Sequence, residues 1–251
     1  MEFKQIFAGA AVGVAAALAS PAVLAGSLTG NADVVSDYVF RGVDQTGTTP
    51  AVQGGVDYSF DIGAYSGLWA SNSLSQGGTE ADIYAGYGQK IGSFDVDGGL
   101  IYYWFSERKE VSTLANSDYP ELYVSGGFGP ASLKVFYANK FGKDNGTSGY
   151  TTNTKRDQML YVTASANLTL TDTVSVIPQV GYSTLKGVKD VYGDSYVDFS
   201  VTGVKKLDND LSVTLQVVDS TIKDVDLNPA NGQQHDQPKF IIGLKKTFKV
   251  L

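Results

Sequence analysis

The stretch that decides the fold is Phe94–Phe105, with the sequence F-D-V-D-G-G-L-I-Y-Y-W-F. Every second residue is apolar or small, and this set comprises Phe94, Val96, Gly98, Leu100, Tyr102 and Trp104. The residues between them, which include Asp95 and Asp97, form a second set. A period of two predicts a β-strand, because successive side chains of an extended chain point to opposite sides of a sheet. The apolar set would pack on a second sheet in a soluble sandwich, whereas in a membrane barrel it would face lipid, with aromatic residues at the interfaces.

The same period recurs along the chain and predicts twelve strands, most of them close to the ~9–11 residues of a tilted membrane strand. They cover residues 27–41, 51–60, 64–73, 80–90, 94–106, 121–128, 132–140, 158–170, 174–183, 196–206, 211–220 and 239–248. Pro178 lies within one of them and cannot donate a ladder hydrogen bond. We therefore expect a bulge or weaker pairing at Pro178.

The connections between these strands alternate in length. Short turns at 61–63, 91–93, 129–131, 171–173 and 207–210 alternate with longer polar segments at 42–50, 74–79, 107–120, 141–157, 184–195 and 221–238. Bacterial outer-membrane barrels have brief periplasmic turns and longer outer loops, whereas a soluble sandwich has no reason to keep its long loops at one end. The sequence therefore predicts an all-β, transmembrane, antiparallel up-and-down β-barrel of about 12 strands.

The distribution of charged and aromatic side chains agrees with this fold. Nearly every strand charge falls on the inward set, and Lys or Arg facing lipid at mid-depth would cost ~2–4 kcal/mol. The exceptions Lys205 and Lys246 are expected near the periplasmic ends, and Asp219 near an outer end. Outward aromatics are predicted at strand ends: Tyr38, Phe40, Trp104 and Phe240 outside, and Phe60, Phe94 and Phe248 on the periplasmic side.

The N-terminus has the composition of a secretory signal. Lys4 precedes an apolar run over residues 6–19, and Val23-Leu24-Ala25 offers a cleavage point before Gly26. The alternative is a membrane anchor, but the run is shorter than the ~20 residues that a spanning helix needs. We expect a cleaved signal peptide at residues 1–25 and one barrel domain at 26–251.

Composition narrows the function. The chain has 251 residues, no Cys and a formal charge of −7. The absence of Cys excludes a disulfide framework and thiolate chemistry, and the negative charge argues against a nucleic-acid partner.

Several motifs of the first half resemble the TorF family of porin-like proteins. They are Ser36-Asp37-Tyr38-Val39-Phe40-Arg41-Gly42, Gln45, Pro50 to Gly55, Asp57-Tyr58, Tyr65-Ser66-Gly67, Trp69 to Asn72, then Glu80, Asp82, Tyr84, Gly86-Tyr87, Gly99 to Tyr103 and Pro120 to Tyr123. The resemblance implies a β-barrel in the outer membrane of a Gram-negative bacterium, with no established substrate. It also implies insertion by the barrel-assembly machinery, although Phe248 is followed by Lys249-Val250-Leu251 rather than ending the chain.

No catalytic constellation is evident, so we predict that the protein is not an enzyme and needs no metal or cofactor. His235 is the single histidine and lies in a long polar segment, where a base would be poorly fixed relative to a nucleophile. The pattern Asp224-x-Asp226-x-Asn228 suggests calcium, but Pro229 replaces the glycine that a calcium loop requires.

The inward polar residues are the candidate site. Asp37 and Arg41 are expected on the first strand near the outer mouth, at a height similar to that of Lys239. The pore-lining candidates are Asp37, Arg41, Asp57, Asp82, Asp95, Asp97, Glu121, Lys134 and Asp198. Their acidic excess would favour cations, because charged rings set ion selectivity.

Three hypotheses follow. The first is an outer-membrane channel for ions or small polar solutes with weak cation preference. The second is a non-conducting structural or surface-interaction barrel whose lumen is filled by side chains, since inward Tyr84, Tyr103, Phe105 and Tyr123 could plug it. The third is a secreted soluble β-protein.

Overall fold

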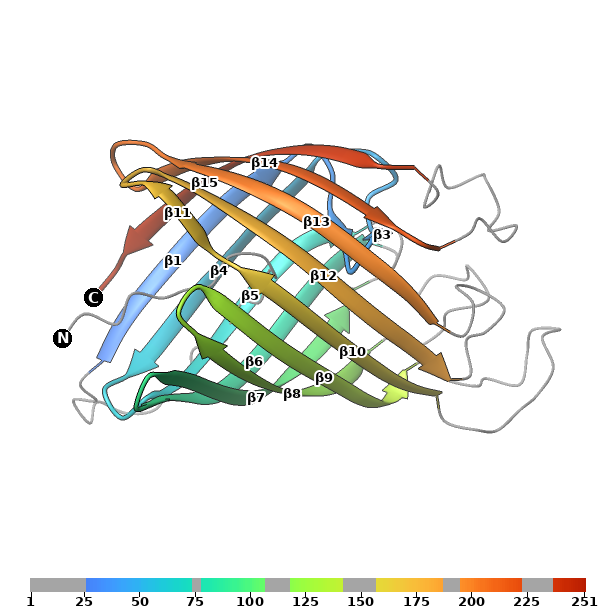
Figure 1. The fold of residues 1–251 in the computed structure, drawn as a ribbon, viewed down its shortest axis with the longest axis horizontal. Coiled ribbons are helices and arrows are strands. Elements are labelled where there is room, and N and C mark those ends of the chain that lie inside the picture. Colours follow the sequence, from blue (N-terminus) through green and yellow to red (C-terminus); the bar gives the residue numbers. More distant parts are fainter. Residues whose placement is uncertain (1–25, 74–77, 107–117, 142–156, 187–194, 223–236) are drawn as a thin grey trace, which may run out of the picture.

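The computed structural model describes residues 26–73, 78–106, 118–141, 157–186, 195–222 and 237–251, and they form a β-barrel (Figure 1). The predicted signal peptide, His235 and the segment 224–229 lie outside the described residues. No helix in the described ranges is long and apolar enough to cross a membrane.

Twelve antiparallel strands, which we call staves, make up the wall of the barrel. They are β1 (Gly26–Val35), β4 (Ala51–Phe60), β5 (Ala64–Ser73), β6 (Gly78–Ile91), β7 (Phe94–Phe105), β8 (Tyr119–Phe128), β9 (Ala131–Phe141), β10 (Asp157–Ala166) continued by β11 (Leu168–Thr171), β12 (Val174–Lys186), β13 (Ser195–Lys206), β14 (Leu211–Ser220) and β15 (Lys239–Lys249). The wall is closed, because β1 pairs with β15 over Thr29↔Lys249 to Val35↔Gly243, and β10 pairs with β12. The predicted barrel of about 12 strands is confirmed.

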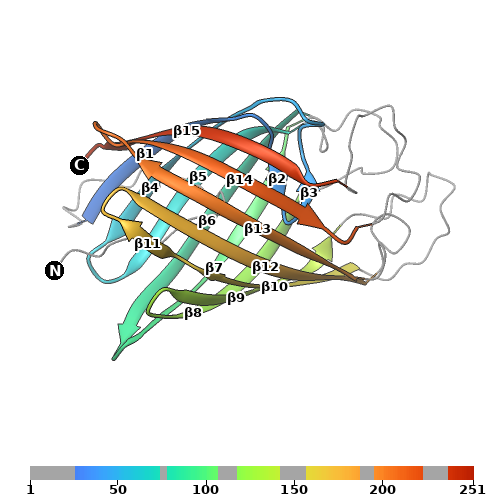
Figure 2. The same ribbon diagram turned by 45° about the horizontal axis from the view of Figure 1, so that its top comes forward.

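The alternation of connections is also confirmed. The short turns and the C-terminus lie at one end of the barrel, and the strands are tilted against its axis (Figures 1 and 2). Glycines with positive φ occupy several of these turns, for example Gly63 (φ 92°) and Gly92 (φ 60°). Left-handed backbone is available to glycine at little cost, so these turns can be as short as the hairpin geometry allows.

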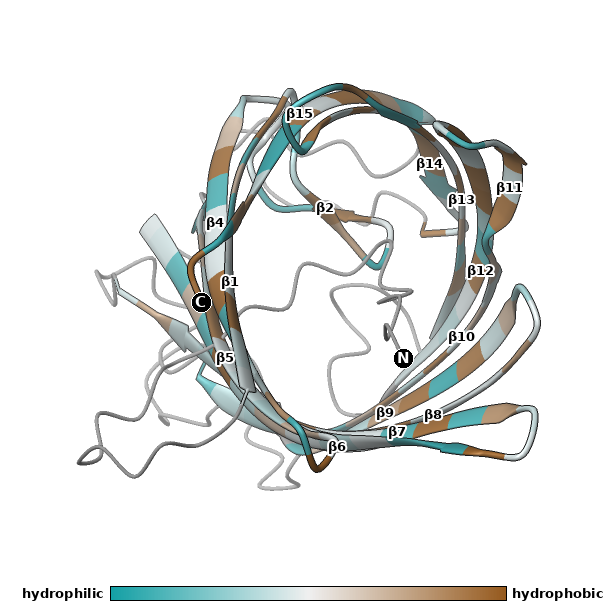
Figure 3. Cartoon of the chain, turned by 90° about the vertical axis from the view of Figure 1, so that its left-hand side faces the viewer, coloured by the Kyte–Doolittle hydropathy of each residue, from teal (hydrophilic) through white to brown (hydrophobic). Residues whose placement is uncertain are grey.

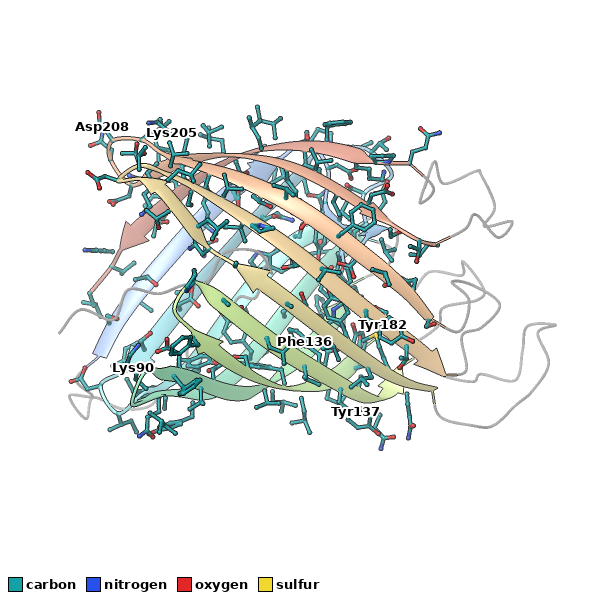
Figure 4. The ribbon with its side chains drawn as sticks, viewed as in Figure 1. Lys90, Phe136, Tyr137, Tyr182, Lys205 and Asp208 are labelled. Carbon is teal, nitrogen blue, oxygen red and sulfur yellow. The ribbon has the colours of Figure 1, made fainter. Side chains whose placement is uncertain are left out.

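The two faces of each strand separate as predicted. On β7, Leu100, Tyr102 and Trp104 are exposed on the outside, whereas Ile101 and Tyr103 are buried inside. Figure 4 shows the same division, with Phe136 inside the wall and Tyr137 and Tyr182 outside it. The outer surface is thus apolar, as a wall in contact with lipid requires.

Two outward-facing lysines of the described strands lie near the rim of the barrel. Lys205 and Asp208 lie at the short-turn end of the barrel (Figure 4), and Lys205 Nζ donates a 2.8 Å hydrogen bond to Thr173 Oγ1. Lys246 Nζ reaches the carbonyl of Asn209 in the same turn region. Both lysines therefore lie where their long stems can reach water.

Pro178 interrupts the hydrogen-bond ladder on one side of β12, as its missing N–H group predicts. β12 runs through Pro178 and pairs it with Val201 of β13. On its other side, the ladder to β10 ends at Ser165↔Gln179 and resumes with Leu168↔Val176. The stave opposite Pro178 is consequently divided into β10 and β11.

One predicted strand is wrong. The first strand was expected over residues 27–41, but β1 ends at Val35, and residues 36–50 leave the wall. Tyr38 and Phe40 are therefore not outward aromatics: Tyr38 is buried inside the barrel, and Phe40 packs against Tyr103 there.

Candidate functional site

The segment Ser36–Pro50 folds back into the lumen as a small hairpin, which we call the lumen hairpin. It is made of β2 (Val39–Phe40) and β3 (Val43–Asp44), which pair with each other and with no stave of the wall. Figure 3, which looks along the barrel, shows β2 inside the ring of strands.

The turn of this hairpin is built by Arg41 and Gly42, whose φ angles are 51° and 77°. Two successive residues with positive φ are what a tight two-residue hairpin needs. Left-handed backbone is costly for a side chain as large as arginine, so tertiary contacts must hold Arg41 there.

Those contacts are an ion pair buried in the lumen. Arg41 Nη1 and Nη2 donate hydrogen bonds of 2.9 and 2.7 Å to the two oxygens of Glu121 on β8. The side chains of Arg41 and Glu121 are only 5% and 0% exposed. Such a bidentate fork is the strongest common geometry for a guanidinium and a carboxylate.

Aromatic rings complete the pocket around the guanidinium. The Arg41 Cζ lies 4.5 Å from the centre of the Phe136 ring and 4.4 Å from that of Tyr161. Phe40 of the hairpin itself lies 4.6 Å away. Each ring face attracts the cation, and the attraction grows where water is excluded.

The hairpin spans the lumen. Gly42 at its tip lies so close to the barrel wall that a Cβ there would come within 2.8 Å of Ser220 Cβ on β14 and 2.9 Å of Asp198 Cβ on β13. In the ring of strands, β14 and β13 follow β15 on one side of β1, whereas β8, which carries the Arg41 partner Glu121, lies on the opposite side. The hairpin and the Arg41 side chain together therefore reach across the interior.

The base of the hairpin is fixed by a second set of charges. Lys239 Nζ on β15 donates hydrogen bonds of 2.6 Å to Asp44 and 3.3 Å to Asp37. Asp44 also accepts from the backbone N–H groups of Thr46, Gly47 and Thr48. Thr46 Oγ1 donates to Asp37 at 2.8 Å, which closes the network.

This network decides how the hairpin carboxylates titrate. Burial alone would raise the pKa of Asp44, but the Lys239 ammonium and the backbone N–H donors outweigh it, so the pKa is lowered. Burial raises the pKa of Asp37, and the nearby Asp44 charge adds to the increase. Burial would lower the pKa of Arg41, but the Glu121 charge dominates and raises it, so Arg41 stays charged.

Aromatic contacts anchor the hairpin on the side of β5 to β8. Tyr38 packs edge-to-face on Trp69 with ring centres 5.6 Å apart, and its hydroxyl lies 3.4 Å from Glu80 Oε1. Phe40 packs on Tyr103, which in turn stacks on Tyr119.

Three of the other candidates are engaged with aromatic side chains of the inner wall. Asp57 accepts a 2.6 Å hydrogen bond from Tyr84, and Asp97 accepts one of 2.6 Å from Tyr65. Lys134 Nζ lies 3.9 Å from the centre of the Tyr123 ring.

Asp95, Asp198 and Asp82 complete the set. Asp95 pairs with Lys90 at 3.1 Å at the exposed short-turn rim, where Figure 4 shows Lys90. Asp198 accepts a 3.1 Å hydrogen bond from Tyr161 beneath the hairpin tip. Asp82 is buried on β6.

Asp37 and Arg41 thus lie inside the barrel, but the element that carries them is the lumen hairpin and not the predicted strand of the wall. Sequence reasoning missed the roles of Asp44 and Thr46, which hold the base of the hairpin. The sequence did contain an indication: Val39-Phe40 and Val43 flank the dipeptide Arg41-Gly42, an arrangement that fits a two-residue turn.

The closed twelve-stave wall, with its apolar exterior and charged lumen, defines the fold class of the outer-membrane porins. The chain belongs to the family described as bacterial protein of unknown function (Gcw_chp), whose model matches residues 16–248. No curated protein sequence matches the chain.

Solved porin structures share this fold at low sequence identity. The NanC porin is 10% identical with a TM-score of 0.58, over 90% of this chain and 100% of its own. The KdgM porin is 11% identical with a TM-score of 0.51, over 88% of this chain and 99% of its own. The same porin has been solved in complex with disordered oligogalacturonate. At this identity the likeness concerns the fold alone.

Proposed function

We propose that the protein is an outer-membrane channel for ions or small polar solutes, with weak cation preference, and that the lumen hairpin forms its constriction. The observation that carries this proposal is the hairpin itself, a charged element that crosses a porin-type barrel and is held by ion pairs. The resemblance of residues 35–72 to the TorF family, and the porin fold, support it.

Charge on the inner wall supports the cation preference. The acidic side chains of Asp57, Asp97, Asp82, Glu121 and Asp37 all project inward. The inward lysines and Arg41 neutralise only part of them. Rings of carboxylates concentrate cations and exclude anions.

This reading distinguishes the protein from its structural neighbour. The KdgM porin was solved with an oligogalacturonate, a polyanion, whereas an acidic lumen disfavours such a solute. We infer that the solutes of this channel are neutral or cationic.

Location and partners follow from the same proposal. The barrel would lie in the outer membrane of a Gram-negative bacterium after cleavage of residues 1–25, with insertion by the barrel-assembly machinery. The proposed function includes no enzymatic activity.

A non-conducting barrel is the second candidate, and the packing under the hairpin favours it. The rings of Tyr103, Tyr119, Tyr123, Phe136 and Tyr161 form one buried cluster with Val43 of the hairpin. In that case the protein would act through its outer surface as a structural or interaction protein.

Single-channel recording in a planar bilayer across a salt gradient tests the proposal. Discrete conductance steps with a reversal potential on the cation side are expected. A correctly folded barrel, shown by faster electrophoretic migration before heating, that gives no steps would exclude the channel and favour the second candidate.

A further inference from the structure

Two carboxylates of β6 lie side by side under the lumen hairpin, and no cation of the described residues forms an ion pair with either of them. Glu80 and Asp82 are separated by one residue, so they project from the same inner face of the strand. Their exposed fractions are 4% and 1%.

Asp82 has no hydrogen-bond partner at either carboxylate oxygen, and both oxygens are buried. Within the described ranges it is the one carboxylate with both oxygens in this state, since Asp97 and Asp198 each leave a single oxygen unpartnered. Among the described residues, Glu80 accepts one side-chain hydrogen bond, from the Tyr38 hydroxyl at 3.4 Å.

The nearby cations are engaged elsewhere. Arg41 uses both terminal nitrogens on Glu121, and Lys239 is bound to Asp37 and Asp44. Glu121 cannot neutralise the charge of Asp82, because Glu121, like Glu80, is itself a negatively charged neighbour of Asp82. A buried charge without a partner is strongly unfavourable, so a further group must neutralise this pair.

We propose that Glu80 and Asp82 form a binding site for one divalent cation of the calcium class. The two carboxylates carry a charge of −2, which one such ion balances. Side chains two residues apart on a strand face are ~7 Å apart at their base, so their oxygens can converge on one ion at ~2.3–2.6 Å.

The chemistry of the site selects among cations. Two carboxylates can supply four oxygens, and the Tyr38 hydroxyl lies beside them. Calcium accepts irregular oxygen sets, whereas magnesium demands octahedral geometry and keeps much of its water, which suits a buried pair poorly. Because no three acidic or histidine side chains of the described segments converge on one point, a richer metal cluster is not available.

Calcium titration of the full-length barrel in detergent tests this site. After treatment with EDTA, calorimetry in a potassium background is expected to show one calcium ion per barrel. Asp82→Asn should abolish the binding, and Glu80→Gln should weaken it on the order of tenfold or more. Asp95→Asn is the matched control, because Asp95 lies on an inner face at the exposed rim, and it should bind as the unaltered protein does.

Terbium luminescence gives a second measurement that needs no variant. Terbium replaces calcium at oxygen sites and is excited through nearby tyrosines, so the Tyr38 side of the site should sensitise it. Displacement of the signal by calcium, but not by magnesium, is expected.

Equal calcium binding by the unaltered protein and Asp82→Asn would overturn the proposal, as would the absence of both calorimetric and terbium signals. In the latter case a proton neutralises the pair. Neither measurement involves conduction, so failure of this site and failure of the channel proposal are separate results.

Discussion

Removal of the Arg41 guanidinium should release the lumen hairpin. In Arg41→Ala, Glu121 loses a bidentate partner at 0% exposure and keeps the Tyr103 hydroxyl, whose hydrogen bond is 3.0 Å long. Breaking a buried ion pair by deleting one member costs ~3–5 kcal/mol. Since 1.4 kcal/mol is a factor of ten, the ratio of docked to undocked hairpin should fall by roughly two to four orders of magnitude.

Single-channel recording measures this change. We expect Arg41→Ala to give larger or more frequent conductance steps than the unaltered barrel. Lys90→Ala is the control, because the Lys90–Asp95 pair is more than half exposed on both sides (57% and 53%). An exposed pair contributes only ~0–1 kcal/mol.

A double variant distinguishes the effect of the unpaired Glu121 carboxylate from the effect of removing the large Arg41 side chain. Arg41→Ala with Glu121→Gln leaves no unpaired carboxylate, so its hairpin should be docked more often than in Arg41→Ala alone. The reasoning is refuted if Arg41→Ala folds and conducts as the unaltered protein does, or if the double variant is the more severe of the two.

Three further predictions concern other parts of the site. Gly42→Ala should loosen the hairpin and raise conductance, since φ is +77° and the added Cβ would lie 2.8 Å from Ser220 Cβ on β14. Gly92→Ala, at φ +60° with no atom within 4 Å, should leave conductance unchanged. Because the pKa of Asp44 is lowered, its contribution to hairpin docking is complete above the ordinary carboxyl range near ~4 and is lost as pH falls through the lowered value. Conductance of the unaltered barrel should therefore rise below about pH 4, and an equal rise in Asp44→Asn would contradict the assignment. Asp97→Asn leaves the Lys134 charge less compensated, so the reversal potential should move toward anions; no movement would exclude Asp97 from the conduction path.

The wall was predictable because it repeats one simple rule. Membrane strands must alternate apolar and inward residues, so Phe94–Phe105 contains in one segment the pattern that governs all staves. The strands at Ala51–Phe60, Ala64–Ser73 and Leu211–Ser220 have the predicted bounds. Pro178 perturbs the ladder as its missing N–H requires.

The hairpin escaped prediction because its residues also alternate. Tyr38 and Phe40 have the spacing of outward aromatics, and Asp37 and Arg41 that of inward charges, so the pattern of a continuing strand and that of a hairpin coincide locally. Tertiary contacts decide between them, and their partner Glu121 lies 80 residues away from Arg41. A strand of fifteen residues would also have been longer than the ~9–11 that a membrane requires.

The face on which each candidate charge lies could be inferred from the sequence, but its pairing could not. Asp44 and Lys239 are 195 residues apart and meet only because β15 closes onto β1. Periodicity gives the face on which a side chain lies, and the register between distant strands gives its partner.

The long sequence separations between the lumen hairpin and the residues that hold it also bear on how the molecule is assembled. Its base needs Lys239 of the last stave and its tip needs Glu121 and Phe136 from the middle of the chain. The complete set of contacts therefore exists only after the last stave has joined the first. Closure of the ring and fixing of the hairpin in the lumen are therefore coupled: in an unclosed barrel the hairpin lacks the Lys239 contacts that hold its base.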